Sequence, residues 1–192
     1  MAKRDVRIFG DPVLRQKARE VTNFDAPLAK LATDMFDTMR EHNGVGLAAP
    51  QVGVLKRLFT WEVERPIDET GDHFELDGGA VVNPVLVDAS QELVEDDEGC
   101  LSFPGLFYPV QRAMRVQIQY ADLHGDEHLV DLEDFYARIF LHEMDHLDGI
   151  LFIDHLAKHD RKEAMRRMRV QRQEQDLDER SPAAGLGLFG GL

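Results

Sequence analysis

The sequence predicts an α+β fold: a single domain of antiparallel strands around a buried helix, with a further helix at its C-terminal end. Two observations lead to this prediction. Segments rich in β-branched and aromatic residues recur between turn signals, a pattern typical of strands. The segment 132–149 is apolar around most of its helical circumference, which indicates a helix buried among them.

Size and composition fit one ordinary folded domain. The chain has 192 residues, of which 43% are hydrophobic and 30% charged, as in typical globular proteins. No apolar run approaches the roughly 20 residues of a membrane span, so no membrane partner is expected. The N-terminal apolar stretch is too short for a signal peptide, and the single cysteine, Cys100, fits a reducing compartment. We therefore expect a cytoplasmic protein.

Charge is distributed unevenly along the chain. The formal net charge is -14, which argues against a surface that binds nucleic acid as a whole, and no direct DNA binding is expected. Residues 158–172 are the exception, with seven lysines and arginines against two acidic residues. Such a run is most often a solvated helix face, and the alternative is a docking surface for an acidic or nucleic-acid partner.

The first predicted helix covers residues 25–43. Its apolar residues recur every three or four positions, which predicts one buried face. Asp25 and Pro27 are typical of a helix start, and Asn43 with Gly44 of a helix end.

Strands are predicted in four segments. Three of them, 57–63, 80–87 and 114–122, are rich in β-branched and aromatic residues, and a short one follows at 129–132. The polar segment 64–79 is predicted to be a loop or a long hairpin turn.

The C-terminal half changes to helical periodicity. Acidic residues stand near the start of segment 132–149, as the helix dipole favours, and Gly149 closes it. A last helix is expected over about 153–173. The domain is predicted to comprise residues 1–175, and residues 176–192 to form a flexible glycine-rich tail.

The stretch His-Glu-Met-Asp-His at 142–146 carries the clearest chemical signal. Two histidines four residues apart leave the same face of a helix and can bind one metal ion. Glu143 lies beside that face, where its carboxylate can reach a water on the metal rather than the metal itself. Burying these polar groups without a partner would cost several kcal/mol, so the sequence favours a metal site over core histidines. The buried helix is thus predicted to be a metal-binding helix.

A catalytic metal site needs a third protein ligand. The pattern with three histidines is excluded, because Phe152 stands where the third would be. Glu163 on the following helix is a candidate, although it lies among charged residues, and the spacing of Asp154 and His155 does not favour either. Cys100 is the favoured candidate, since a thiolate is a strong ligand for iron or zinc. A lone cysteine can otherwise be a small buried hydrophobe.

The segment 43–53 is small and punctuated by glycine. Such a loop lets the backbone approach a ligand closely, and Gln51 offers an amide donor. A hydrolytic metal site needs donors of this kind for a developing oxyanion.

Three stretches in this order resemble the motifs of the peptide deformylase family. They are GVGLAAPQ at 44–51, EGCLS at 98–102 and HEMDH at 142–146. GDPVLR near the N-terminus and DHLDGILFID through Asp154 are similar as well, so the resemblance covers residues 8–157.

The resemblance implies metal-dependent hydrolysis of the N-formyl group from formyl-methionine at the N-terminus of nascent polypeptides, with release of formate. It implies one divalent ion, physiologically Fe²⁺, which Zn²⁺, Ni²⁺ or Co²⁺ can replace. The implied roles are metal ligands for Cys100, His142 and His146, general acid and base for Glu143, oxyanion donors for Gln51 and the backbone N–H of Leu101, and substrate-backbone binding for Gly46.

A formyl-methionine substrate also needs an apolar pocket beside the metal. The positions one helical turn before His142 are Arg138 and Ile139, with Phe135 beyond them. We expect Val45, Phe135 and Ile139 to line this pocket, and Arg138 to contribute only its aliphatic stem.

Further expectations concern the surroundings of the site. The resemblance implies a charge pair between Glu98 and Arg112 that braces the cysteine loop. Because the substrate would emerge from an RNA-rich particle, we expect the basic residues 158–172 to dock on the ribosome. Two alternatives stay open. A zinc endopeptidase would take its third ligand from Glu163 or His155, and a structural metal site in a binding protein would have four protein ligands.

Overall fold

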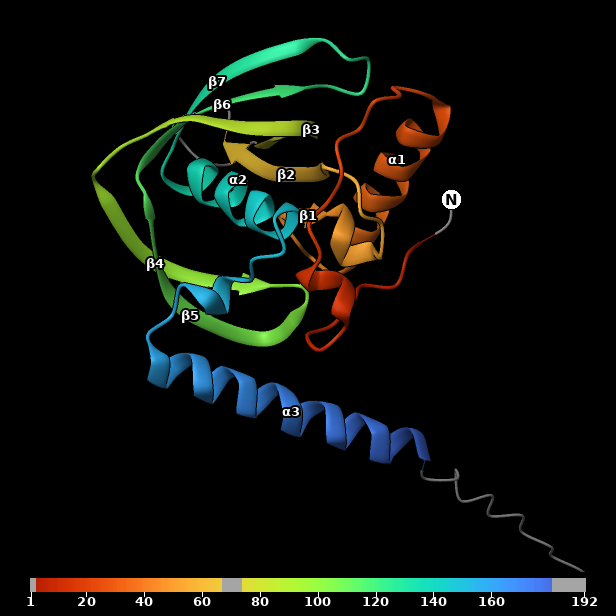
Figure 1. The fold of residues 1–192 in the computed structure, drawn as a ribbon, viewed down its shortest axis with the longest axis vertical. Coiled ribbons are helices and arrows are strands. Elements are labelled where there is room, and N and C mark those ends of the chain that lie inside the picture. Colours follow the sequence, from red (N-terminus) through yellow and green to blue (C-terminus); the bar gives the residue numbers. More distant parts are fainter. Residues whose placement is uncertain (1–2, 67–73, 181–192) are drawn as a thin grey trace, which may run out of the picture. The chain divides into compact units, whose positions relative to one another are not determined.

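The structure is a computed structural model that describes the backbone of residues 3–66 and 74–180 and the side chains of residues 3–65 and 74–174. The chain divides into two compact units, Met1–Leu156 and Ala157–Leu192. The first unit is an α+β arrangement of antiparallel strands with a helix among them (Figure 1), so the predicted fold class is confirmed. In the described part of the chain, no helix is long and apolar enough to cross a membrane.

The elements follow one another along the chain in the order of Figure 1. They are η1 (Pro12–Arg15), α1 (Ala26–Glu41), β1 (Gly46–Ala48), η2 (Ala49–Val52), β2 (Leu58–Pro66), β3 (Phe74–Ala89), β4 (Leu93–Cys100), β5 (Phe103–Ala113), β6 (Arg115–Ala121), β7 (Glu127–Glu133), α2 (Asp134–Leu147), η3 (Phe152–Asp154) and α3 (Lys158–Arg180).

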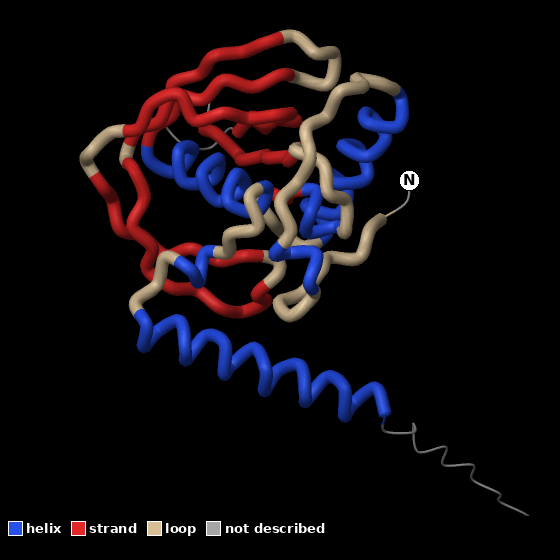
Figure 2. Tube along the Cα trace, viewed as in Figure 1, coloured by secondary structure: helices blue, strands red, loops and turns tan. Residues whose placement is uncertain are grey.

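The strands form two sheets. Five of them pair in the order β1-β2-β3-β6-β7, antiparallel throughout, so that β1 and β7 are the edge strands. The other two, β4 and β5, pair only with each other, and Figure 2 shows them as a separate pair. We call this pair the cysteine ribbon, because it carries Cys100 at the end of β4.

Helices α1 and α2 cover opposite faces of the five-stranded sheet. Successive side chains of a strand point to opposite faces, and β2 shows the consequence. Leu58 belongs to the apolar cluster that holds Met35 of α1. Its neighbour Phe59 belongs to the cluster of α2 and meets Phe140 edge-on, with ring centroids 5.1 Å apart. The metal-motif helix is therefore packed into one of the two cores.

The predicted ends of α1 are confirmed. The Asp25 side chain accepts a hydrogen bond from the Leu28 N–H at 3.0 Å, which caps the helix start. Asn43 follows the helix in a left-handed conformation, with φ of 53°, as is common just beyond a helix end.

The hairpin of β2 and β3 is longer than the sequence predicts. The predicted loop 64–79 is strand at both ends, because the pairing runs out to Pro66 opposite Phe74; residues 67–73 lie outside the described part. Gly78 belongs to this ladder, and a Cβ there would stand 2.6 Å from the Trp61 carbonyl oxygen. Gly78 thus permits a close approach of the two strands.

The C-terminal helix is shifted relative to its prediction. It begins at Lys158 rather than near 153 and continues to Arg180. Residues 152–154 instead form the short helix η3, in which the Asp154 carboxylate accepts the Leu151 N–H at 2.9 Å. The predicted tail is therefore helical at its start, and residues 181–192 lie outside the described part.

Candidate active site

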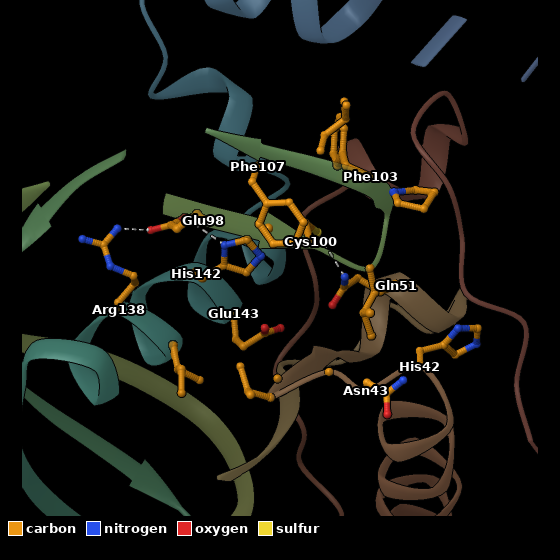
Figure 3. Close-up of a pocket in the computed structure, with 18 of the residues that line it drawn as sticks. His42, Asn43, Gln51, Glu98, Cys100, Phe103, Phe107, Arg138, His142 and Glu143 are labelled. Atoms are coloured by element: carbon orange, nitrogen blue, oxygen red, sulfur yellow. Dashed lines mark hydrogen bonds and ion pairs between the residues drawn. The ribbon is translucent and has the colours of Figure 1, made fainter. Parts of the chain in front are cut away.

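The three motif stretches meet around one cavity. It has a volume of about 430 Å³ and is lined by residues from the segments 42–51, 98–107 and 138–143. Figure 3 shows Cys100, His142, Glu143 and Gln51 gathered at this cavity from the cysteine ribbon, α2 and η2.

Cys100, His142 and His146 bring their ligand atoms together. One donor atom of each lies within 4.8 Å of the others, and the Cys100 Sγ is 3.2 Å from the His146 Nε2. The two histidines are one turn apart on α2, and their ring centroids are 5.0 Å apart. Phe152, where a third histidine would stand in the longer motif, stacks near His142 with centroids 6.3 Å apart.

The chemistry of these donors fits a divalent metal ion. Burial, and then the neighbouring His142, hold the pKa of His146 well below its ordinary value, which keeps this imidazole neutral as a ligand must be. Burial also opposes the charged form of His142, but hydrogen bonds to Cys100 and Glu98 outweigh it and raise the pKa of His142.

Glu98 is the buried anion behind His142. Its Oε1 accepts from Arg112 Nε at 2.8 Å and from Arg138 Nη1 at 2.9 Å. Its Oε2 accepts from Arg112 Nη2 and from His142 Nδ1, both at 3.0 Å. Burial would raise the pKa of Glu98, but the hydrogen bonds from His142 and Arg112 hold it well below the usual range. With Nδ1 engaged, the His142 ring is oriented and its other nitrogen is available to a metal.

Glu143 is a buried carboxyl beside the metal-ligand cluster. Burial raises the pKa of Glu143 to about 7. Its Oε2 has no hydrogen-bond partner among the described residues, so it is available to a water or a substrate group in the cavity. The carboxyl lies against Gly46, where a Cβ would stand 2.8 Å from the Glu143 Cδ. Gly46 thus makes room for Glu143, a role that the sequence analysis missed.

Gln51 is held with its amide nitrogen toward the cysteine. Its Oε1 accepts the Ala48 N–H at 2.8 Å, so its Nε2 faces the other way. That nitrogen lies 3.5 Å from the Cys100 Sγ and donates to the Ser102 Oγ at 3.2 Å. Leu101 lines the same cavity, in the turn between β4 and β5.

Two of the other candidates for a third ligand pair with other side chains, and the third belongs to a different unit. Asp154 pairs with Arg15. His155 lies 2.7 Å from the Asp145 carboxylate, which also accepts from Arg112. Glu163 belongs to α3, in the second compact unit.

The pocket prediction needs one correction. Val45, Arg138 and Ile139 line the cavity. Phe135 does not, because it stands a further helical turn away, and its side chain is 50% exposed. Four apolar residues of the cysteine ribbon that the sequence analysis missed line the cavity instead: Phe103, Pro104, Leu106 and Phe107. The aromatic-rich run after Cys100 was the available signal.

An α+β fold with a His-Glu-x-x-His helix, a thiol from a separate ribbon and a cavity beside them defines a class of metal-dependent hydrolases. The family model for polypeptide deformylase matches residues 3–162. The chain belongs to the peptide deformylase family.

Relatives and solved structures agree with this assignment. The peptide deformylase of Acidothermus cellulolyticus is 46% identical over 169 residues, covering 88% of this chain and 87% of the relative. That of Thermus thermophilus is 46% identical over 163 residues, covering 80% and 82%. The crystal structure of peptide deformylase from Ehrlichia chaffeensis superposes with a TM-score of 0.82 at 37% identity, covering 92% and 99% of the two chains.

Proposed function

We propose that this protein hydrolyses the N-formyl group of formyl-methionine at the N-terminus of nascent polypeptides and releases formate. The observation that carries the proposal is the convergence of three donor atoms within 4.8 Å beside a buried carboxyl whose pKa is about 7. Family membership supports the same reaction.

The ligands that we propose for the metal are Cys100, His142 and His146. One thiolate and two imidazoles suit iron or zinc and leave a coordination position open. We propose Fe²⁺ as the physiological ion, with Zn²⁺, Ni²⁺ or Co²⁺ able to replace it. A bound ion of this kind would supply Lewis-acid activation, which lowers the pKa of water toward neutrality.

Glu143 is the proposed general base and acid. Burial brings its pKa to about 7, where a group can both accept and return a proton at neutral pH. Glu143 accepts the proton of the attacking water through its unpartnered oxygen. It then delivers this proton to the nitrogen of the leaving amine, which frees the amino terminus.

Gln51 and the Leu101 N–H are the proposed oxyanion donors. The hydrogen bond from Ala48 leaves the Gln51 amide nitrogen directed at the cysteine side of the cavity. A preorganised donor of this kind typically contributes about 3 kcal/mol to stabilising the transition state. Gly46 is proposed to bind the substrate backbone.

The methionine side chain is proposed to enter the cavity between α2 and the loop after α1. Ile139 and Val45 offer apolar surface there, and Arg138 offers its stem. The four acceptors of the Arg138 guanidinium lie on the cysteine ribbon, which supports a pocket wall made of methylene groups rather than charge.

The proposed catalytic domain comprises residues 1–175, and its proposed location is the cytoplasm.

We also propose that α3 docks on the ribosome through its basic residues between 158 and 172. Phosphate contacts weaken steeply with salt. Co-sedimentation with ribosomes should therefore fall as salt rises, and glutamine at Arg161, Arg166, Arg167 and Arg169 should abolish it. Unchanged co-sedimentation of that variant would exclude this docking mode.

The proposed activity is tested by formate release from formyl-Met-Ala-Ser, with acetyl-Met-Ala-Ser as the matched control. Turnover of the formylated peptide alone is expected. Cleavage of an internal peptide bond would instead favour the endopeptidase alternative.

The metal proposal is tested in air, where the iron form should lose activity together with its Cys100 thiol and the redox-inert zinc form should persist. Equal air sensitivity of both forms would contradict it.

A further inference from the structure

We propose that Arg138 is a positioning residue, which fastens the cysteine ribbon to α2 and so holds the Cys100 thiol in register with the two histidines. The proposal deepens the proposed function and rests on it where metal binding is concerned. It concerns the guanidinium of Arg138, for which the sequence predicted no task.

The guanidinium is buried and reaches both strands of the ribbon. Arg138 is 5% exposed and lies one turn before His142 on α2. Its Nη2 donates to the Val94 carbonyl at 3.0 Å, and its Nη1 donates to the Val110 carbonyl at 2.8 Å. Nη1 is also 3.3 Å from the Asp96 carbonyl. Val94 and Asp96 belong to β4 and Val110 to β5, so one side chain bridges the helix to the whole width of the ribbon.

The ribbon needs such a bridge because it is a sheet of its own. A two-stranded sheet is at best marginally stable by itself in water, and among the described residues no strand ladder joins it to the five-stranded sheet. At its base, backbone hydrogen bonds connect Ser90 with Arg115 and Glu92 with Met114. Cys100 lies at the far end of an eight-residue strand, about 25 Å away at roughly 3.3 Å per residue.

Contacts of two other kinds hold the ribbon. At its tip, the Phe9 N–H donates to the Ser102 carbonyl at 2.9 Å, and Phe103 meets Phe152 edge-on. Arg112 extends from β5 to Asp145 of α2, with 2.6 Å between Nη1 and Oδ2. Arg138 is the bridge in the opposite direction, from the helix to the middle of the ribbon.

Arg138 also acts on a metal-ligand candidate through Glu98. The Glu98 Oε1 accepts from Arg138 and Arg112, while its Oε2 accepts from His142 and Arg112, and Figure 3 shows the line from Arg138 through Glu98 to His142. Without Arg138, Oε1 loses one of its two donors. The carboxylate that orients the His142 ring is then less constrained.

Arginine suits this place better than lysine. Its planar guanidinium carries five N–H donors in a fixed geometry, whereas an ammonium carries three around one point. Four acceptor oxygens on two strands match the first arrangement. Arg138→Lys therefore keeps the charge and loses part of the bridge, and Arg138→Met keeps a long stem and loses both.

The test uses the full-length protein with three variants: Arg138→Met, Arg138→Lys and the control Arg115→Met. Arg115 is also an arginine beside a glutamate, 3.7 Å from Glu92, but it is 54% exposed on β6. We expect the zinc dissociation constant to rise by about 10- to 100-fold in Arg138→Met, by less in Arg138→Lys, and not at all in Arg115→Met.

Two readouts on the metal-free protein are independent of metal and of turnover. Amide hydrogen exchange should accelerate across residues 94–110 in both Arg138 variants and stay unchanged in α2. The reaction of a thiol reagent with Cys100, the only cysteine, should accelerate in the same order as the zinc affinity falls. If the wild-type protein bound no zinc, the proposed function would be contradicted. The hydrogen-exchange measurement would still test whether Arg138 holds the ribbon.

Wild-type exchange and zinc affinity in both Arg138 variants would overturn the proposal. If only Arg138→Met loses its cooperative thermal transition, the exchange rates and zinc affinity of Arg138→Lys test the proposal. Loss of folding in both, with Arg115→Met folded, would overturn it too, because Arg138 would then maintain the whole fold rather than the ribbon.

Discussion

Helix α2 and the cysteine ribbon contribute to the same site but are held in place by different forces. The helix is set in an apolar core, where the Phe140 ring is 1% exposed and meets Phe59 and Trp61. The ribbon is joined to the helix largely by ions, with Glu98 between Arg112 and Arg138. Apolar packing is non-directional, while charge-assisted hydrogen bonds fix angle and distance.

The difference indicates a division of tasks. The helix gives the site a stable base, since its histidines are fixed by backbone spacing and core packing. The ribbon carries the third donor, and its ion pairs with the helix contribute to the position of the thiol beside the histidines. Changes in the helix core should therefore alter stability, and changes at the ribbon tip should alter the metal site.

The largest expected effect comes from removing the ribbon's donor. Cys100→Ala should lose bound metal and fall to background turnover, because two imidazoles alone are an incomplete ligand set. Metal content by mass spectrometry and formate release measure the two effects. Glu163→Ala is the matched control and should keep both. Metal loss in Glu163→Ala with metal retained in Cys100→Ala would reverse the assignment.

The next effect is on stability and should separate the two regions. Phe140→Ala on the helix should lower the free energy of unfolding by about 3–5 kcal/mol, the range for a buried phenylalanine. Phe107→Ala on the ribbon, where the residue is 66% exposed, should change it by less than about 0.5 kcal/mol. Urea unfolding followed by circular dichroism measures both. An equal loss of unfolding free energy in Phe140→Ala and Phe107→Ala would contradict the assignment of stability to the helix core rather than to the ribbon.

Glu143→Gln tests the chemistry of the helix without disturbing its packing. Glutamine keeps the size of the side chain but cannot accept the proton, so kcat should fall by ~10²-fold or more. Metal content should stay at the wild-type level. A kcat near the wild-type value would refute Glu143 as the base.

The smallest effect concerns the contact between Gly46 and Glu143. Gly46→Ala places a methyl group where the carboxyl lies, so the base should be displaced and kcat should fall by ~10-fold. Gly79→Ala is the control, since a Cβ there has its nearest neighbour at 3.7 Å. Metal content should be unchanged in both variants. Equal kcat values for Gly46→Ala and Gly79→Ala would show that the backbone at residue 46 shifts to fit the methyl group without displacing Glu143.

Much of α2 could be predicted from the sequence, because its signals are local. The spacing of His142 and His146 follows from helical geometry, and apolar residues around the circumference predict burial. The boundaries were less secure: α2 begins at Asp134, two residues after the expected start.

The cysteine ribbon could not be predicted in the same way. Its first strand contains Glu95, Asp96 and Asp97, acidic residues that have low strand propensity and lie exposed. The bridge of Arg138 joins positions more than 40 residues apart, from Val94 to the helix. Nothing near Arg138 in sequence distinguishes a buried arginine from a solvated one, so its partners became visible only in three dimensions.

The edges of the five-stranded sheet have a consequence for association between molecules. An unpaired edge offers its backbone to any other strand, which makes long, flat edges sites of aggregation. One edge here is β1, only three residues long. The other is β7, which carries Glu127, Asp131 and Glu133. A short edge and an acidic edge both discourage strand addition, so we expect the folded protein to resist strand-to-strand polymerisation through this sheet.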